Sequence, residues 1–503
     1  MKVIPINILP TIKVRKEAPT QRWVEGLDLL ILCVDDDRID ELHHFPCGAA
    51  ILKARARHTA RAGSVFMALP DSSVGVPIVV GIRRRDSGSF DLLTLAARLV
   101  KEACIWRPST VGLAALSVAG SNGLSATDAL VAALLARTET QPSLKATRAR
   151  GWRPTLIEVA GPAPTRTVAA ETVAHLARWM SQLPPNVLHP GTYRRALTAL
   201  AKQRGWRMRV YDEQALRRLV AGAFLAVTRA SPRRDAAIVH LSYRPKKNRS
   251  AEAPIALVGK GLCFDTGGLN LKTARGMLGM HADMAGSAVA LGLLDTLTAL
   301  EHPHPVDAWL ALAENRIGPD AYTQQDVVTA LNGTTIQVMH TDAEGRMVLA
   351  DTLALASRSN PCCIIDFATL TGACVSALTE RMSGAFTNRR ELRALTEAAG
   401  EVSGERVWTF PMDEDFDEDL DSTTADIVQC PIDGKGDHIY AARFLSRFVD
   451  KRIPWVHVDL SSAERSGGLG HVPHTMTGFG VRFGLELIAS QSLATALAPR
   501  RRR

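Results

Sequence analysis

The segment from His340 to Asp351, which reads HTDAEGRMVLAD, places the strongest constraint on how this chain can fold. Asp342, Glu344 and Arg346 alternate with small residues, so on extended backbone the three charged side chains would project from one face. Unpaired charges are costly to bury. The segment is therefore expected either to bind one or two divalent cations or to remain a solvated acidic loop, with Arg346 in a surface ion pair. The segment alone leaves both interpretations open.

Length and composition favour a large globular protein. A chain of 503 residues that is 46% hydrophobic can bury sizeable cores, and its length suggests two domains. Apolar runs stay well short of the roughly 18 residues expected of a membrane span. The first residues lack a small-residue cleavage site, so we expect no signal peptide, no membrane partner and a cytoplasmic location. The eight cysteines show no CxxC spacing and predict reduced thiols, not a disulfide or zinc-finger framework.

The net charge of +9 is unevenly distributed along the chain. Residues 1–160 contain 21 Lys and Arg against 15 Asp and Glu, and Arg500 to Arg503 add four more positive charges, so the rest is close to neutral. Any attraction to nucleic acid would come from the N-terminal part and this tail. Charge runs are more often solvated surfaces, so nucleic-acid binding is kept as an alternative or additional role.

Residues 1–160 are expected to form a smaller N-terminal α/β domain, because short apolar runs alternate there with helix-like segments. The apolar runs are Leu29–Val34, Ala49–Leu52, Ile78–Ile82 and Gly112–Val118, and the helix-like segments are Ser87–Glu102 and Ser125–Thr138. Three consecutive acids, Asp35 to Asp37, are more typical of a solvated turn than of a metal cluster. The segment Gln141–Thr167, rich in Pro, Thr and Arg, is predicted to be the boundary or linker.

Residues 161–503 are expected to form a larger catalytic domain, with a mixed, mostly parallel sheet covered by helices on both faces. The predicted strands are Val210-Tyr211, Ala236–Tyr243 and Ile255–Val258. The predicted helices are Thr167–Trp179, Tyr193–Arg204, Glu213–Thr228, Ser287–Leu300 and Gln325–Leu331.

A glycine-rich loop follows the predicted strand Ile255–Val258. Its sequence, GKGLCFDTGG at Gly259–Gly268, includes Lys260 and Asp265 and lacks the order of a phosphate-binding P-loop. Open α/β sheets bind ligands at the carboxyl ends of their strands. Lys272 and Asp283 come soon after; the first could be a surface charge, and the second could cap a helix.

Together these segments predict a hydrolytic metal site. Hard oxygen ligands in this number suit two divalent ions sharing bridging carboxylates, and the set is Asp265, Asp283, Asp342 and Glu344. Lys260 could join as a ligand only as the neutral amine, which a dicationic centre would favour by lowering its pKa. Lys272 and Arg346 would remain cationic and face the oxyanion that develops on the substrate.

The quoted residues resemble the leucine aminopeptidase (cytosol aminopeptidase) family, whose signature NTDAEGR corresponds to HTDAEGR at His340–Arg346. The resemblance covers essentially all of 170–490 and is weak over 1–160. It extends to VGKGLCFDTGG at Val258–Gly268, LNLK at Leu269–Lys272, MHADMAGSA at Met280–Ala288, AENRIGPDAYTQQDVV at Ala313–Val328 and DFATLTGAC at Asp366–Cys374.

The resemblance implies a role for each site residue. Two divalent ions, Zn²⁺ or Mn²⁺, would be held by Lys260, Asp265, Asp283, Asp342 and Glu344, with Asp265 and Glu344 bridging them. Lys272 would stabilise the tetrahedral intermediate, and Arg346 would hold a bicarbonate acting as general base. Met280, Thr369 and Gly372 would line the pocket for the first side chain of the substrate.

The resemblance also implies what the protein does. It would hydrolyse the first peptide bond of peptides with a free α-amine through a two-metal-bridged hydroxide, would prefer Leu or another apolar first residue, and would assemble as a homohexamer. A catalytically silent structural subunit is the remaining alternative.

Three departures from the family pattern are visible in the sequence. His340 replaces the usual Asn beside the metal ligands, and Glu464 adds a charge near the expected mouth of the pocket. The segment Gly436–Tyr440 replaces a stretch of small residues that normally precedes a helix.

Overall fold

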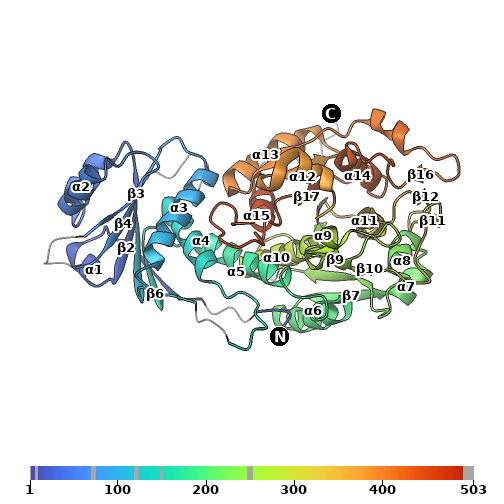
Figure 1. Cartoon of the computed structure of the whole chain (residues 1–503), viewed down its shortest axis with the longest axis horizontal. Helices are drawn as coiled ribbons and strands as arrows, with labels where there is room; N and C mark the ends of the chain where they lie inside the picture. The colour runs from blue at the N-terminus through green and yellow to red at the C-terminus, as the bar shows by residue number, and fades with distance from the viewer. Residues whose placement is uncertain are drawn as a thin grey trace.

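The computed structural model describes residues 2–5, 9–69, 75–117, 124–147, 151–245 and 253–490. Two β-sheets lie at opposite ends of an elongated molecule, and helix α5 (Thr165–Met180) passes between them (Figure 1). Val118 and the Arg500–Arg503 tail, which entered the sequence predictions, lie outside the described residues.

The N-terminal sheet has the strand order β1-β6-β5-β2-β4-β3, and within it β3 runs antiparallel to β4 while the other described pairs are parallel. Its elements are β1 (Thr11–Arg15), α1 (Gln21–Glu25), β2 (Leu29–Asp35), α2 (Gly48–Arg57), β3 (Val65–Ala68), β4 (Ile78–Arg83), α3 (Ser89–Cys104), β5 (Thr110–Leu116), α4 (Ala126–Thr138) and β6 (Leu156–Ala160). Alternate residues of β2 face opposite sides, so Leu29 and Ile31 pack with α3 and α4, whereas Leu30 and Leu32 pack with α1 and α2.

Two predictions for this part were wrong. The run Ala49–Leu52 lies in helix α2, because it continues into an Ala-rich segment whose residues favour helix over strand. The segment Gln141–Thr167, predicted to be the boundary or linker, is not a linker throughout, because it contains β6, which pairs with both β1 and β5, and the first turn of α5. The flanking Pro and Arg residues obscured the alternating sequence LIEVA of that strand.

The acidic and basic runs near the end of β2 pair with each other. Asp35 is buried, and its Oδ1 lies 3.7 Å from Nη1 of buried Arg83 on the neighbouring strand β4. Arg85 donates to Asp37 at 2.6 Å, and its main-chain N–H donates to Asp36. The prediction of a wholly solvated acidic turn was therefore wrong for Asp35, because a cationic neighbour compensates its burial.

The larger sheet has the order β15-β14-β17-β13-β9-β10-β8-β7, with parallel pairing at its centre and antiparallel pairs toward both edges. Its strands are β7 (Arg207–Asp212), β8 (Ala237–Tyr243), β9 (Ile255–Asp265), β10 (Val306–Asn315), β13 (Cys363–Ala368), β14 (Ser383–Thr387), β15 (Val407–Thr409) and β17 (Trp455–Asp459). A small separate sheet contains β11 (Val327–Thr329), β12 (Thr335–Gln337) and β16 (Ile427–Val428).

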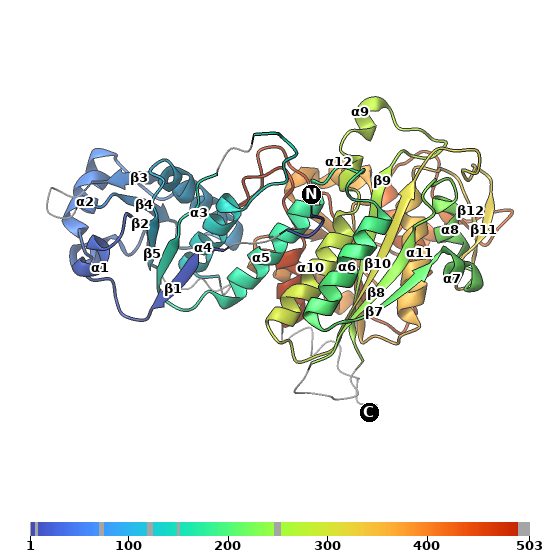
Figure 2. The same ribbon diagram turned by 90° about the horizontal axis from the view of Figure 1, so that it is seen from below.

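Helices cover both faces of the larger sheet, as the sequence predicted (Figure 2). Helices α5, α6 (Pro190–Arg204), α10 (Ala285–Ala299), α13 (Arg390–Ser403) and α15 (Val481–Ala489) contribute to one core cluster. Helices α7 (Glu213–Arg218), α8 (Gly222–Thr228), α11 (Glu344–Ser357) and α14 (Asp437–Ser446) contribute to the other. The short helices α9 (Ala274–Met277) and α12 (Gly372–Leu378) lie near the carboxyl ends of the central strands. The α/β class and the mixed central sheet are thus confirmed.

Two helix predictions in this part need correction. The segment Gln325–Leu331 contains strand β11, not a helix. The predicted helix Glu213–Thr228 is two helices, α7 and α8, which separate at Val220, a residue with a positive φ of 59°.

One stretch, Ala274–Ala299, is long and apolar enough to cross a membrane by length and composition. The sequence prediction did not include this stretch, because Arg275, Asp283 and Asp295 interrupt its apolar residues. Of the 18 residues that form its most apolar part, 72% are buried inside the protein. Its longest helix, α10, packs against β9, β10 and α5. Such burial is typical of a core helix.

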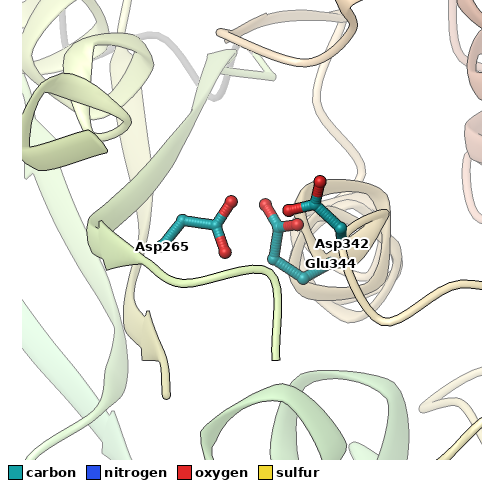
Figure 3. Close-up of side chains that lie close together, drawn as sticks. All are labelled: Asp265, Asp342 and Glu344. Carbon is teal, nitrogen blue, oxygen red and sulfur yellow. The ribbon is translucent and has the colours of Figure 1, made fainter. Parts of the chain in front are cut away.

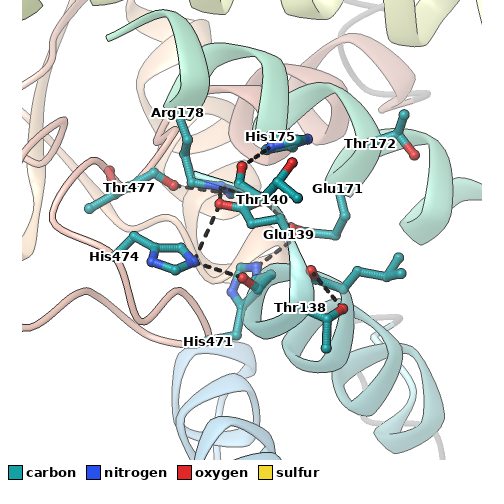
Figure 4. A network of polar contacts seen from close by, with 12 residues as sticks. Thr138, Glu139, Thr140, Glu171, Thr172, His175, Arg178, His471, His474 and Thr477 are labelled. Carbon is teal, nitrogen blue, oxygen red and sulfur yellow. Dashed lines mark hydrogen bonds and ion pairs between the residues drawn. The ribbon is translucent and has the colours of Figure 1, made fainter. Parts of the chain in front are cut away.

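A buried polar network joins the N-terminal part to the larger part of the chain (Figure 4). The guanidinium of Arg178 on α5 is 1% exposed and contacts Glu139, just after α4, at 2.8 Å and Glu171 at 3.3 Å. Glu171 also pairs with His471 at 2.8 Å and with Arg482 of α15 at 3.2 Å. The end of α4, helix α5, the segment with His471 and helix α15 therefore share one set of buried charges.

We expect Arg178→Met to lower the free energy of unfolding by about 3–5 kcal/mol, because it leaves two buried carboxylates without their shared cation. Arg166→Met is the matched control, since Arg166 on the same helix is 45% exposed in its pair with Glu486 and should change stability by less than about 1 kcal/mol. Urea denaturation of both variants measures the difference, and equal effects would contradict the proposed importance of the buried network.

Candidate metal centre

A cavity of about 660 Å³ opens at the carboxyl ends of β9 and β13, within the size range of small-molecule sites. Arg346 is not among its lining residues. The other predicted site residues all line it: Lys260, Asp265, Lys272, Met280, Asp283, Asp342, Glu344, Thr369 and Gly372.

Strand β9 and the loop after it position Asp265. The strand is buried along nearly its whole length, and Asp265 is its last residue. One oxygen, Oδ1, accepts hydrogen bonds from the Gly267 N–H at 2.8 Å and from Asn315 Nδ2 at 2.9 Å. Gly267 has a φ of +83°, and a Cβ there would lie 2.9 Å from Asp342 Oδ1 and 2.5 Å from a main-chain oxygen. The glycine therefore allows the loop to turn closely past the second acidic segment.

The segment that carries Asp342 and Glu344 is a turn followed by a helix, so the prediction of extended backbone was wrong. Helix α11 begins at Glu344, and its positive N-terminal end favours nearby carboxylates. The buried Thr341 hydroxyl donates to the main-chain oxygen of Gly267 at 2.7 Å, which ties the turn to the glycine-rich loop. The imidazole Nδ1 of His340 lies 3.3 Å from the Asp342 N–H and can accept its hydrogen bond.

Carboxylates from these two segments converge (Figure 3). Ligand atoms of Asp265, Asp342 and Glu344 all lie within 4.8 Å of one another. Lys260 Nζ lies 2.8 Å from Asp283 Oδ1 and 3.1 Å from Glu344 Oε1. A Cβ on Gly345 would lie 2.7 Å from Nζ and Cε of Lys260, so a glycine is needed for the lysine to pass α11.

Lys272 supplies the second positive charge at this cluster. Its Nζ lies 2.9 Å from Asp265 Oδ2 and also contacts Asp342. Thr369 connects the cluster to the end of β13, because its hydroxyl donates to Asp283 Oδ1 at 2.6 Å while its main-chain oxygen accepts from Lys260 at 2.8 Å.

The pKa shifts show how strongly these acids are crowded. Burial, and then repulsion from Asp265, raises the pKa of Glu344 to about 8. Burial likewise raises the pKa of Asp283 to about 6, despite attraction from Lys260. Burial acts to lower the pKa of Lys260, but Asp283 and Glu344 outweigh it and raise that pKa.

The donor set fits divalent cations. The oxygen Oδ2 of Asp283 is buried and has no hydrogen-bond partner among the described residues. Converging carboxylate oxygens of this kind are the ligands that hard divalent cations prefer. Lys260 is the one proposed ligand that would bind through nitrogen. In this structure the ammonium groups of Lys260 and Lys272 balance the negative charge of the acids.

Arg346 does not line the cavity. It is 2% exposed, and its Nη2 donates to both oxygens of Asp437, at 2.7 and 2.6 Å. Its Nη1 donates to the main-chain oxygen of Gln429 at 3.3 Å. The expectation that this guanidinium faces a substrate oxyanion is not met by its position.

Beyond the carboxylate cluster the cavity is lined by apolar residues and by further charged residues, which include Asp459 and Arg465. Met280 and Met476 line it together with Glu380 and Glu464. A Cβ placed on Gly279, next to Met280, would lie 3.8 Å from Glu464 Oε2. Burial, and then the nearby Glu380, raises the pKa of Glu464.

Sequence reasoning missed several supporting residues. Asn315 donates to the main-chain oxygen of Thr341 as well as to Asp265, and so couples β10 to the acidic turn. Gln429 bonds the main chain of residues 339, 340 and 343. Asn315 lies inside a quoted family segment, which was a usable signal; Gln429 and Asp437 lie far from the acidic turn in sequence.

Comparisons with known proteins point to one family. The catalytic domain of the cytosol aminopeptidase family matches residues 175–484. A "Probable cytosol aminopeptidase" of Synechococcus sp. (strain JA-3-3Ab) is 40% identical over 333 residues, which span 65% of this chain and 64% of that protein. The match thus spans somewhat less than two thirds of this relative's length.

Solved structures match over almost the whole chain. The bottromycin maturation enzyme BotP in complex with Mn is 31% identical with a TM-score of 0.78, covering 92% of this chain and 100% of that one. The cytosol aminopeptidase from Coxiella burnetii is 26% identical with a TM-score of 0.78, covering 96% and 99%.

Loading the purified protein with Mn²⁺ or Zn²⁺ should give about two bound ions per chain, and Asp342→Ala should retain about one, because it removes a single ligand group. The matched control is Asp320→Ala, an exposed carboxylate outside the cavity that should leave the metal content unchanged. Elemental analysis after removal of free metal gives the stoichiometry. Equal metal loss in both variants would contradict the assigned ligand set.

Proposed function

The chain belongs to the cytosol aminopeptidase family, and from this premise we propose that it is a metal-dependent aminopeptidase. It hydrolyses the first peptide bond of peptides that carry a free α-amine. The observation that carries the proposal is the convergence of Asp265, Asp342 and Glu344 within 4.8 Å in a cavity also lined by Lys272.

The metal site is proposed to hold two divalent cations through Lys260, Asp265, Asp283, Asp342 and Glu344. Bound there, such ions would polarise the peptide carbonyl, activate water and hold the substrate amine. Mn²⁺ is the favoured ion, since BotP was solved with Mn, and Zn²⁺ is the alternative.

Other side chains at this cavity are proposed to stabilise the developing charge and to orient the carboxylates. Lys272 is 16% exposed and can donate to the carbonyl oxygen as negative charge develops on it. The Thr369 hydroxyl orients Asp283, and Asn315 and Gly267 orient Asp265 through hydrogen bonds to its Oδ1. These fixed bonds limit rearrangement of the carboxylates during turnover.

Bicarbonate is the one expected group that does not fit. The resemblance assigns it to Arg346, but both oxygens of Asp437 already accept from the Nη2 of that guanidinium. No step of the proposed reaction is assigned to bicarbonate.

The first side chain of the substrate is proposed to enter the cavity beside Met280, Thr369 and Gly372. A Cβ on Gly372 would meet nothing within 4 Å, so the glycine faces open space. Apolar lining residues such as Met280 and Met476 support the predicted preference for leucine, whereas Glu380 and Glu464 disfavour an acidic first residue.

Three further expectations remain predictions: the homohexamer, the cytoplasmic location suggested by the names of the relatives, and binding of nucleic acid. The last has weak support among the described residues, since Arg83, Arg84 and Arg85 each pair with an aspartate. We therefore favour the enzyme role over a DNA-binding one or a silent structural subunit.

The metal-loaded protein should cleave leucyl-anilide and leave N-acetyl-leucyl-anilide intact, because the blocked amine cannot bind a cation. Lys272→Ala should lower kcat by about 10²–10³-fold by removing the donor to the oxyanion. Lys435→Ala, an exposed lysine that pairs with Asp433, should leave kcat unchanged. Cleavage of the blocked substrate would refute exopeptidase action.

Glu464→Met should raise the ratio of kcat/KM for leucyl over lysyl substrates by about tenfold, because it removes one of the carboxylates that line the cavity beside Met280. Glu414→Met, at an exposed glutamate outside the cavity, serves as the matched control. Steady-state kinetics with both substrates gives the ratio. An unchanged ratio in Glu464→Met would show that Glu464 does not contact the first side chain.

A further inference from the structure

The environment of Arg346 differs from that of an arginine held ready for a soluble anion. Arg346 lies in the first turn of α11, two residues after the proposed ligand Glu344, and its side chain is 2% exposed. Asp437, the first residue of α14, presents both carboxylate oxygens to its Nη2. Charge-assisted contacts of this kind are strong.

Asp437 provides the same chemical group that a bound bicarbonate would offer. Each presents a planar, singly charged pair of oxygens to a guanidinium. Gly436 before it has a φ of +62°, in the left-handed region, and α14 begins directly after this turn. The carboxylate is therefore held at Arg346 by the backbone of the chain itself, and its side chain is only 24% exposed.

A second anion at this position would be electrostatically unfavourable. One guanidinium already balances one carboxylate, and the acids of the metal cluster lie nearby on the same helix and turn. Arg346 offers its Nη1 to Gln429, while its Nε is buried with no hydrogen-bond partner among the described residues. A soluble anion would have to displace Asp437 or bind without Nη2, through Nε and the second N–H of Nη1.

We propose that Asp437 permanently occupies the anion position at Arg346, so that peptide hydrolysis by this chain does not require bicarbonate. The inference rests on the proposed aminopeptidase activity for its kinetic part only. Asp437 acts in it as a positioning residue, because it contacts Arg346 and is not among the residues that line the cavity.

The first test compares the metal-loaded protein in buffer freed of carbon dioxide with the same buffer containing about 10 mM bicarbonate. The kcat of the unaltered protein should differ by less than about twofold. A severalfold rise on addition of bicarbonate would overturn the proposal, since it would reveal an anion site that Asp437 does not fill. Absence of activity in both buffers would instead contradict the proposed function.

The second test removes the carboxylate that contacts Arg346. Asp437→Gly should lose about tenfold or more in kcat because a buried guanidinium loses its counter-ion, and bicarbonate should restore most of the loss. Asp437→Asn keeps the volume of the side chain and should be impaired without restoration. Asp433→Gly is the matched control, since Asp433 is exposed and pairs only with Lys435 among the described residues.

A third readout needs no activity. Bicarbonate should raise the thermal midpoint of metal-free Asp437→Gly, because a ligand that binds only the folded state stabilises it, and should leave the unaltered protein and Asp433→Gly unchanged. Equal shifts in all three proteins would overturn the proposal. If Asp437→Gly does not fold, the bicarbonate response of the unaltered protein and of Asp437→Asn still decides the question.

Discussion

The balance of charge at the end of β9 constrains how the segments around the cavity are placed. Asp265, Asp283 and Glu344 are each less than 9% exposed, and two lysine ammonium groups are placed between them. Such a cluster is stable only if positive charge remains within it, and bound divalent cations supply that charge most effectively. The close approach of Lys260 to α11, which Gly345 permits, is a direct consequence of this requirement.

The residue patterns predicted the layers of the fold because alternating burial is a local property. In β9, Leu257 and Val258 belong to opposite core clusters, as expected for a strand covered on both faces. The same local reasoning failed at Ala49–Leu52, where four apolar residues fit either a strand or one side of a helix. It also failed for the linker, because the pairing of β6 with β1 involves residues about 145 positions apart.

A ligand set could be proposed from the sequence because its residues lie in short segments that resemble one family. The spatial relation of those segments could not be derived from spacing alone: Asp342 and Glu344 reach the cluster from a turn and a helix start, not from a strand. Asp437 was noticed only as a departure from the family pattern. Its partner is 91 positions away, and only the folded chain shows that the two charges meet.

The three departures have different physical consequences, which bear on how this site works. His340 retains a hydrogen-bond acceptor for the Asp342 N–H, so it preserves the turn. Glu464 adds a negative charge to the cavity wall that is proposed to receive the substrate side chain. Asp437 changes what neutralises Arg346. None removes a proposed metal ligand, and each alters a different neighbour of the cluster. The arrangement therefore favours an enzyme whose hydrolytic chemistry is retained while its substrate preference and its need for a soluble anion have changed.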